Sequence, residues 1–178
     1  MSQIEQTVTA LKNRFGSAIE RVIEFRGETT VSVKRQAIIE VLRFLKESPD
    51  LNYTFLADLT AYDDHPNEPR FKVIYQLREM ADYTNLRVKC LVPGSEPVLP
   101  TATGVYPNAN WPERELFDMF GLTFTGHPDL RRLLMPDDWH GHPLRKDYPL
   151  GYEEVEFTFN FDDIDGKKTY ARDEEARR

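Results

Sequence analysis

Apolar residues recur at helical spacing in two stretches within the first fifty residues of the chain. In residues 4–15 they follow one another at intervals of four, three and four positions, which places them on one face of an α-helix. Ser2 and Glu5 stand at the spacing of a capping box, and Gly16 is placed to end this helix. A second run with the same periodicity predicts another amphipathic helix over about residues 34–47.

Several stretches carry the alternating or continuously apolar pattern of β-strands. They lie at residues 19–25, 29–33, 53–61, 71–78 and 86–90, and a short turn that contains glycine joins the first two into a hairpin. Cys90 falls on the apolar side of the last stretch, so we expect its thiol in the core rather than in a reactive role. Residues 92–100 hold three prolines and a glycine and are expected to form a loop.

This order of elements favours an α+β fold. We expect a two-layer domain with two helices packed on one face of a mixed or antiparallel sheet, followed by a long ordered loop region and an extended C-terminal tail. The predicted domain covers residues 1–150, and the tail covers residues 151–178. A chain of 178 residues is long enough to bury one sizeable core and too short for a second enzyme-sized domain.

Residues 110–150, here called the signature segment, hold both tryptophans and the densest mixture of opposite charges. The first part of the segment predicts a short helix at 111–120, with Asn110 as its N-cap and Gly121 as a left-handed C-cap. The rest contains too many glycines and prolines for a long regular element, and too many large apolar residues for disorder. We therefore expect an ordered, irregular loop, which in a compact domain is usually functional.

Ion pairs are expected to hold this loop, because cations and carboxylates alternate along it. Arg114 and Asp118 are four positions apart on the predicted helix and can pair. Glu113, which also has the capping-box spacing from Asn110, and Glu115 are placed to meet guanidinium groups of this chain or of a partner. The candidate guanidinium groups in this chain are those of Arg131, Arg132 and Arg145. The residues predicted to carry the structural and interface role are Glu113, Arg114, Glu115, Asp118, His127, Arg131, Arg132, Arg145, Lys146 and Asp147.

Beyond residue 150 the sequence becomes acidic and aromatic. Val155, Phe157, Phe159 and Phe161 alternate with polar residues, which predicts an extended segment with one apolar side. Two interpretations stay open: the segment is one more strand of the domain's own sheet, or it is a tail that docks on a partner.

Charge and cysteine content exclude several classes of protein. A formal net charge of −7 and a pI near 5.2 disfavour nucleic acid and anionic membranes as partners, since both attract basic surfaces. A single cysteine cannot form an internal disulfide or hold an iron–sulfur cluster with four thiolates from this chain. The N-terminal sequence does not have the pattern of a signal peptide, and no run of eighteen apolar residues predicts a membrane span.

The usual phosphate, dinucleotide, serine-hydrolase and zincin motifs are absent from the sequence. The strongest candidate for local chemistry is a zinc site formed by His127, His140 and His142 with Asp137 or Asp138 nearby. The same histidines also suit a rigid loop, in which imidazoles serve as ordinary hydrogen-bonding groups. A stand-alone metal-dependent enzyme that uses these three histidines is therefore the alternative function.

Several motifs carry a family resemblance. Within the signature segment they are ERELFDMF at 113–120, HPDLRRLLMP at 127–136 and DDWHGHPLRKDYP at 137–149, with looser matches upstream at LADLTAYD (56–63), YQL (75–77) and VYPNANW (105–111). Together they resemble the signature of the 30 kDa subunit family of NADH:quinone oxidoreductase, respiratory complex I, whose bacterial members are designated C. The resemblance covers most of the chain and is weakest in the N-terminal helix and the last twenty or so residues.

The resemblance implies a structural role. Members of this family are cofactor-free subunits in the hydrophilic arm of a proton-translocating enzyme that transfers electrons from NADH to quinone. The implied partners are the quinone-cavity subunit, designated D, and neighbouring iron–sulfur subunits, while FMN and the iron–sulfur clusters reside on other subunits. The implied location is the cytoplasmic side of the bacterial cell membrane, peripheral, with membrane contact only through the complex. No chemistry is then expected on this chain alone.

Overall fold

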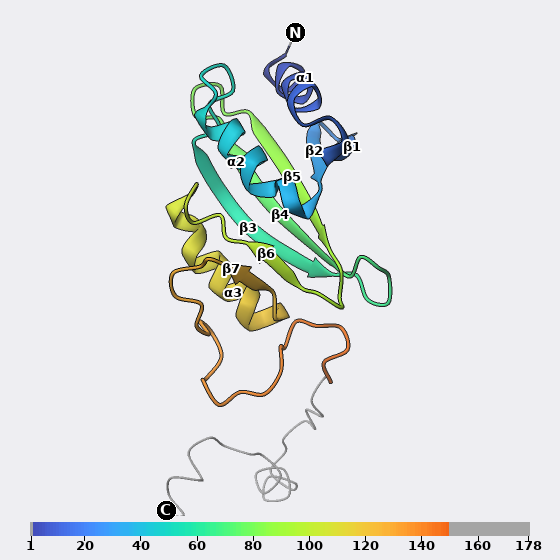
Figure 1. Ribbon diagram of the computed structural model, residues 1–178, viewed down its shortest axis with the longest axis vertical. Coiled ribbons are helices and arrows are strands. Elements are labelled where there is room, and N and C mark those ends of the chain that lie inside the picture. Colours follow the sequence, from blue (N-terminus) through green and yellow to red (C-terminus); the bar gives the residue numbers. More distant parts are fainter. Residues whose placement is uncertain (1, 150–178) are drawn as a thin grey trace, which may run out of the picture. The chain divides into compact units, whose positions relative to one another are not determined.

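The computed structural model of the chain describes residues 2–149, and Figure 1 shows the order of their elements. The helices are α1 (Gln3–Phe15), α2 (Ile38–Glu47) and α3 (Asn110–Phe120). The longer strands are β1 (Ile19–Phe25), β2 (Glu28–Val33), β3 (Phe55–Asp63), β4 (Phe71–Arg78) and β5 (Asn85–Val92), and two short strands are β6 (Val98–Pro100) and β7 (Thr123–Thr125). The expectations for the tail, including those for Val155, Phe157, Phe159 and Phe161, lie outside the described residues, and the boundary after residue 150 stays a prediction.

The first helix matches its sequence signals closely. The Ser2 hydroxyl accepts a hydrogen bond from the backbone N–H of Glu5, and the Glu5 carboxylate accepts one from the backbone N–H of Ser2, so the capping box is confirmed. Gly16 follows α1 with a positive φ of 46°, which ends the helix. The second helix is shorter than predicted, because a 3₁₀ turn at Arg35–Ala37 precedes it.

The long strands form one mixed sheet in the order β1-β2-β5-β4-β3. The β1–β2 and β3–β4–β5 neighbours are antiparallel, while β2 and β5 pair in parallel from Thr30–Arg87 to Val33–Cys90. This arrangement confirms the predicted α+β fold with a mixed sheet. The prediction that 92–100 is only a loop is wrong, because β6 pairs in parallel with β7. Its partner lies more than twenty positions away, and local pattern does not reveal so short a non-local pairing.

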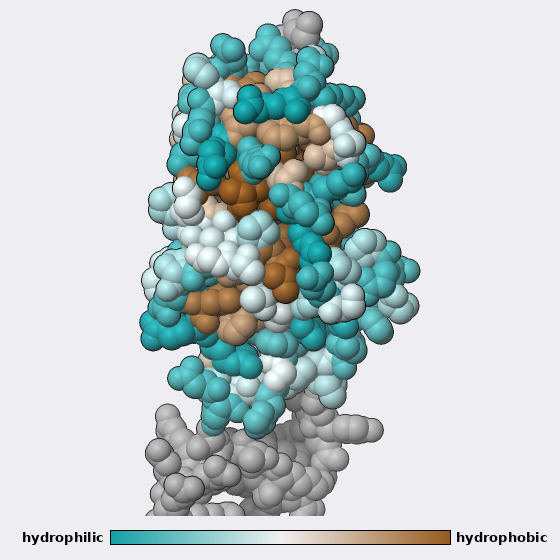
Figure 2. All heavy atoms as spheres, in the orientation of Figure 1, coloured by the Kyte–Doolittle hydropathy of each residue, from teal (hydrophilic) through white to brown (hydrophobic). Residues whose placement is uncertain are grey.

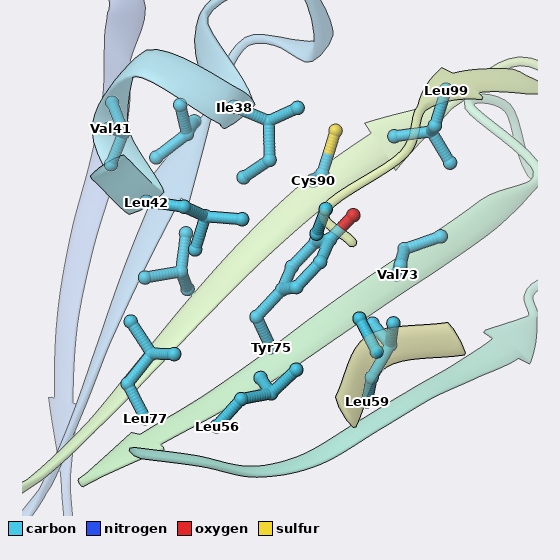
Figure 3. Packing of buried hydrophobic residues seen from close by; sticks show 14 of the residues in the cluster. Ile38, Val41, Leu42, Leu56, Leu59, Val73, Tyr75, Leu77, Cys90 and Leu99 are labelled. Carbon is cyan, nitrogen blue, oxygen red and sulfur yellow. The ribbon is translucent and has the colours of Figure 1, made fainter. Parts of the chain in front are cut away.

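The helices pack on one face of the sheet. Side chains of α2, among them Ile38 and Leu42, lie against Tyr75 and Cys90, as Figure 3 shows. Cys90 is fully buried, which confirms its predicted position, and burial raises the pKa of its thiol to about 12.

The other two helices join the same apolar core. Phe120 of α3 makes an edge-to-face contact with Phe71 of β4, with ring centroids 6.4 Å apart. Phe15 at the end of α1 makes a similar contact with Phe44 of α2, at 5.5 Å. Seen from this side, the surface is largely hydrophilic, with apolar patches in the regions of α2 and α3 (Figure 2). The patch near α3 lies in the region of the signature segment.

Candidate interaction site

The helix α3 begins without a side-chain cap. The 3₁₀ turn at Pro107–Ala109 runs directly into it, so Asn110 already has helical dihedral angles (φ −50°, ψ −53°). The prediction that Asn110 caps the helix is therefore wrong, because a cap residue stands outside helical geometry. Gly121 takes the left-handed conformation (φ 71°, ψ 30°), which confirms the predicted C-cap.

The carbonyl groups in the last turn of α3 are all hydrogen-bonded, and most of their donors come from the loop that follows. The N–H of Gly121 donates to the carbonyl of Phe117, a ring nitrogen of His142 to Asp118, the N–H of Leu144 to Met119, and the Arg145 Nε to Phe120. Arg145 also brings a cation to the negative end of the helix dipole. The loop thus ends the helix and is fixed by it.

This close approach of loop and helix requires glycine at position 121. A Cβ added to Gly121 would lie 2.5 Å from Nη2 of Arg145 and 2.5 Å from Nε2 of His142. The positive φ adds a second constraint, since other residues rarely adopt it.

Asp118 is the centre of the loop's hydrogen bonding. Its buried carboxylate accepts bonds from the guanidinium of Arg132 at 2.6 Å and from the backbone N–H groups of Leu133, Leu134 and Met135 at 3.1, 2.8 and 2.8 Å. Burial alone raises the pKa of Asp118, but these donors lower it by more, so the pKa lies below its ordinary value. One carboxylate therefore orders four consecutive residues of the loop.

The predicted pair of Arg114 with Asp118 is wrong. Asp118 points to the buried side of α3, whereas the Arg114 guanidinium donates to the carbonyl oxygens of Arg131 at 3.1 Å and Arg132 at 3.0 Å. The same guanidinium lies 4.9 Å from the centroid of the Trp111 ring, within the range of a cation–π contact. Arg114 thus holds the loop through its backbone rather than through an ion pair.

Within residues 2–149 Glu113 forms no salt bridge with a guanidinium group, so the predicted pairing with Arg131, Arg132 or Arg145 is wrong. Its carboxylate is fully buried and accepts hydrogen bonds from the Thr101 hydroxyl at 2.5 Å and from the Ala102 N–H at 2.6 Å. Burial raises the pKa of Glu113 to about 7, because it penalises the charged form by more than these two bonds favour it. Its position on α3 places Glu113 against the segment that follows β6. Because this contact depends on the folded chain, local sequence pattern did not predict it.

His127 lies beside this carboxylate. Its side chain is fully buried, and Nε2 is 3.9 Å from the nearer oxygen of Glu113. The backbone N–H of Asp129 donates to Nδ1 at 3.0 Å, so the proton resides on Nε2, which faces the carbonyl of Asn110 at 3.2 Å. These contacts assign a neutral imidazole that joins the loop to the first turn of α3.

The end of the described loop is attached to the sheet by an ion-pair network that the sequence did not reveal. Arg70 binds Asp63 at 2.7 Å and Asp147 at 2.6 Å, and the backbone N–H of Lys146 donates to Asp63 at 2.8 Å. Asp63 is buried, and although burial raises its pKa, the guanidinium of Arg70 and two backbone donors hold it well below its ordinary value. The only sequence signal was the position of Asp63 at the end of the LADLTAYD motif.

The remaining predicted residues are on the surface. Arg131 pairs with Asp129 at 2.7 Å, but both side chains are largely exposed. Glu115 is exposed and makes no salt bridge within residues 2–149, and Lys146 contributes its backbone rather than its ammonium group. Arg145 likewise contacts a carbonyl group and the Phe71 ring instead of a glutamate.

Within residues 110–149, four large apolar side chains of the signature segment remain exposed on this ordered frame. Trp111 is 60% exposed, Leu134 61%, Trp139 39% and Leu144 52%. Tryptophans and arginines are the residues most often found at the energetic centres of interfaces. The loop therefore presents apolar side chains at fixed positions, which is the arrangement of a docking surface.

Sequence comparison identifies the family of this chain. The family described as "Respiratory-chain NADH dehydrogenase, 30 Kd subunit" matches residues 31–154. The chain belongs to this family.

Curated relatives of this 30 kDa subunit family are similar along most of their length. The NADH-quinone oxidoreductase subunit designated C in Roseiflexus sp. (strain RS-1) is 47% identical over 163 residues, which cover 92% of this chain and 94% of the relative. Its counterpart of the same name in Geobacter sulfurreducens is 48% identical over 151 residues, with 84% and 92% covered.

Solved structures agree with the fold. A trypsin-resistant fragment (1–134) of Nqo5 has a TM-score of 0.62 and 29% identity, and the match covers 72% of this chain and all of the fragment. The membrane-bound sulfane sulfur reductase, an archaeal respiratory membrane complex, contains a chain with a TM-score of 0.73, 23% identity and coverage of 96% and 94%. At that identity the second similarity concerns the fold alone.

In this member of the 30 kDa subunit family, His127, His140 and His142 do not form the metal site of the alternative function. Within residues 2–149 no three His, Cys, Asp or Glu side chains are grouped to hold a metal ion. Both ring nitrogens of His127 face backbone groups, and Nδ1 of His142 binds the carbonyl of Asp118. In the same part of the chain no helix combines the length and apolar character of a membrane span.

Proposed function

We propose that this chain is a cofactor-free structural subunit in the hydrophilic arm of a proton-translocating NADH:quinone oxidoreductase. It supports the quinone-cavity subunit, designated D, and contacts neighbouring iron–sulfur subunits, while electrons pass from NADH to quinone through other chains. In this proposal the chain is a peripheral part of a membrane complex and lies on the cytoplasmic side of the bacterial cell membrane. FMN and the clusters belong to the other subunits.

The observation that carries this proposal is how the signature segment uses its polar groups. The carboxylates of Glu113 and Asp118 and the guanidinium groups of Arg114 and Arg132 all bind groups of their own chain. They hold a loop in place rather than converge on an empty site for a substrate. Among its exposed residues this frame presents the large apolar side chains of Trp111, Leu134, Trp139 and Leu144, and the sequence motifs of the family lie on it.

The proposal predicts which side chains anchor the partner. Truncation of an interface anchor such as tryptophan commonly costs about 2 kcal/mol or more in binding. We therefore expect Trp139→Ala and Leu134→Ala to weaken association with the quinone-cavity subunit. The melting temperature of the isolated Leu134 variant should stay nearly unchanged, because largely exposed side chains contribute within about 0.5 kcal/mol to stability, whereas the Trp139 variant should melt somewhat earlier because Trp139 is only 39% exposed.

The experiment purifies the native complex through an affinity tag on this chain and quantifies the other subunits and NADH:quinone activity. Lys12→Ala is the control, since Lys12 is exposed on α1, far along the chain from the signature segment. Loss of the quinone-cavity subunit in the Trp139 and Leu134 variants, but not in the control, supports the proposal. If the wild-type chain purifies without any subunit of such a complex, the proposed function is wrong.

A further inference from the structure

The long sheet has one covered face and one open face. The helices pack on the side of Val31, Tyr75 and Val88, and alternation along each strand sends the neighbouring residues to the other side. This other side, here called the open face, has no helix packed on it within residues 2–149. It differs in chemistry from both the core and the signature segment.

The open face contains apolar side chains that the core does not use. Ile23, Ile74 and Leu91 are half-buried by their neighbours in the sheet but stand outside the core cluster. Phe25 on β1 and Phe55 on β3 are 66% and 44% exposed at opposite edges of the same end of the sheet. These side chains give the open face an apolar component beside its charged groups.

The charge of the open face is opposite to that of the whole chain. Strand register places five basic side chains on this side, those of Arg21, Lys72, Arg78, Arg87 and Lys89, of which Lys72 is buried, and two acidic ones, those of Glu28 and Asp58. The complete chain has a formal net charge of −7. Two of the pairs are local, Arg87 with Glu28 at 2.8 Å and Lys72 with Asp64 at 2.7 Å. Arg21 and Lys89 form no salt bridge within the described residues.

A cleft lies at the end of this surface that carries the two exposed phenylalanines. The parallel pairing of β2 with β5 begins only at Thr30 and Arg87, so the two hairpin tips beyond it are not joined by strand pairing. A pocket of about 310 Å³ lies between them, with Gln76, Tyr83, Asn85 and Arg87 among the side chains that line it. The pocket offers an aromatic ring and two amides to a side chain that enters it, while the guanidinium of Arg87 is paired with the Glu28 carboxylate that also lines the pocket.

We propose that the open face docks an acidic segment of another subunit of the same complex. Basic side chains between apolar ones complement carboxylates that alternate with apolar groups, and this charge complementarity favours an acidic segment over a basic one. The inference rests on the proposed function, because it places the chain in a complex with other subunits.

The size of the open face sets the strength of this contact. Five strands about 4.8 Å apart and six to nine residues long, at about 3.3 Å per residue, give a surface of roughly 20 Å by 25 Å. That is about 500 Å², less than the roughly 800 Å² that each partner buries in a standard interface. The open face therefore reinforces an assembly that the signature segment anchors, rather than forming it alone.

A zero-length carbodiimide cross-linker tests the contact, because it joins an amine to a carboxylate that touches it. Applied to the purified native complex, it should join Lys89 to an Asp or Glu of another subunit. The rate at which acetic anhydride acetylates Lys89 should be roughly tenfold or more lower in the complex than in the isolated chain, since the centre of an interface excludes solvent. Lys12, exposed on α1, gives the reactivity of an amine on the other side of the sheet.

Charge reversal gives an independent test. The double variant Arg21→Glu/Lys89→Glu should be retained in the complex about tenfold or more weakly at moderate salt, because both changes place a negative charge against the acidic partner segment. Lys12→Glu with Arg43→Glu makes the same charge change on exposed positions of α1 and α2 and should leave retention unchanged. Far-UV circular dichroism and melting temperature verify that both variants fold.

The outcomes separate the two proposals. A complex that contains the chain, with Lys89 as reactive as in the isolated chain, overturns the open-face contact and leaves the proposed function standing. A cross-link from Lys89 to residues 153–165 of this chain also overturns it, because the occupant is then the chain's own acidic segment. A wild-type chain found in no such complex refutes the proposed function itself.

Discussion

The sheet core and the signature segment are stabilised by different means. Under α2 the chain buries aliphatic and aromatic side chains from four strands and a helix, and many similar contacts share the free energy of folding. Around α3 the chain is irregular, and a few polar groups, chiefly Asp118, Glu113 and Arg132, fix its path. In the sheet core many contacts share the stabilisation, whereas in the ordered loop a few polar groups provide most of it.

This difference predicts how each region fails. Removal of one methyl or methylene group from the core weakens the whole domain, since all its elements meet there. Removal of one polar partner in the signature segment leaves several buried donors without an acceptor at once. The loop should then open while the sheet persists, because the two depend on different interactions.

The largest effect is expected from Asp118→Asn. Breaking a buried pair costs about 3–5 kcal/mol, because Arg132 and three backbone N–H groups lose the charged acceptor that they share. Amide hydrogen exchange at 133–135 should accelerate far more than exchange in β4 and β5. Leu42→Ala is the contrast: it should cost about 2–5 kcal/mol and accelerate exchange in the sheet and the loop together. Equal acceleration everywhere in the Asp118 variant would contradict the separation of the two regions.

Glu113→Gln should remove a pH dependence of stability. The folded pKa near 7 lies above the ordinary value of 4.5, so the folded state holds its proton more tightly than the unfolded state. The stabilisation is complete below about pH 4.5 and is lost as pH rises through about 7, a total of about 3 kcal/mol. Urea unfolding from pH 4.5 to 8 should show this loss in the wild type and a flatter profile in the variant. Parallel profiles would show that the Glu113 carboxyl does not titrate in this range.

Gly121→Ala should destabilise the junction of helix and loop by about 1–3 kcal/mol, since it combines a positive φ with a Cβ placed against two side chains. Gly104→Ala serves as the control, because an added Cβ there meets nothing within 4 Å. The melting temperatures of the two variants measure the difference. If the Gly121 variant is as stable as the Gly104 variant, the loop approaches the helix less closely than in this structure.

The smallest effect is expected from Asp129→Asn. The pair of Asp129 with Arg131 is 2.7 Å long but lies in solvent, where water screens the attraction and such pairs add little stability. Chemical denaturation should find a smaller change than for Gly121→Ala, and added salt should reduce it further. A loss comparable to that of Asp118→Asn would show that exposed charges, too, hold the loop.

Sequence reasoning succeeded where the relevant information is local. The cap formed by Ser2 and Glu5, the left-handed Gly121 and the buried Cys90 each follow from short-range pattern, and the structure confirms them. It failed where a contact joins distant segments. Asp118 and Arg114 had the spacing of a helical pair, but their partners are loop groups whose position depends on the folded chain. The link from Arg70 to Asp147 spans nearly half the sequence and was invisible for the same reason.

The parallel seam between β2 and β5 has a consequence for the order in which the chain can fold. The β1–β2 hairpin is complete early in synthesis, but its only partner in the described sheet emerges after residue 85. Until then β2 presents an unpaired edge in the nascent chain, and closing the seam requires a contact of long sequence separation, which slows folding. A ribosome-bound chain that stops before β5 should therefore be the species that most needs a chaperone.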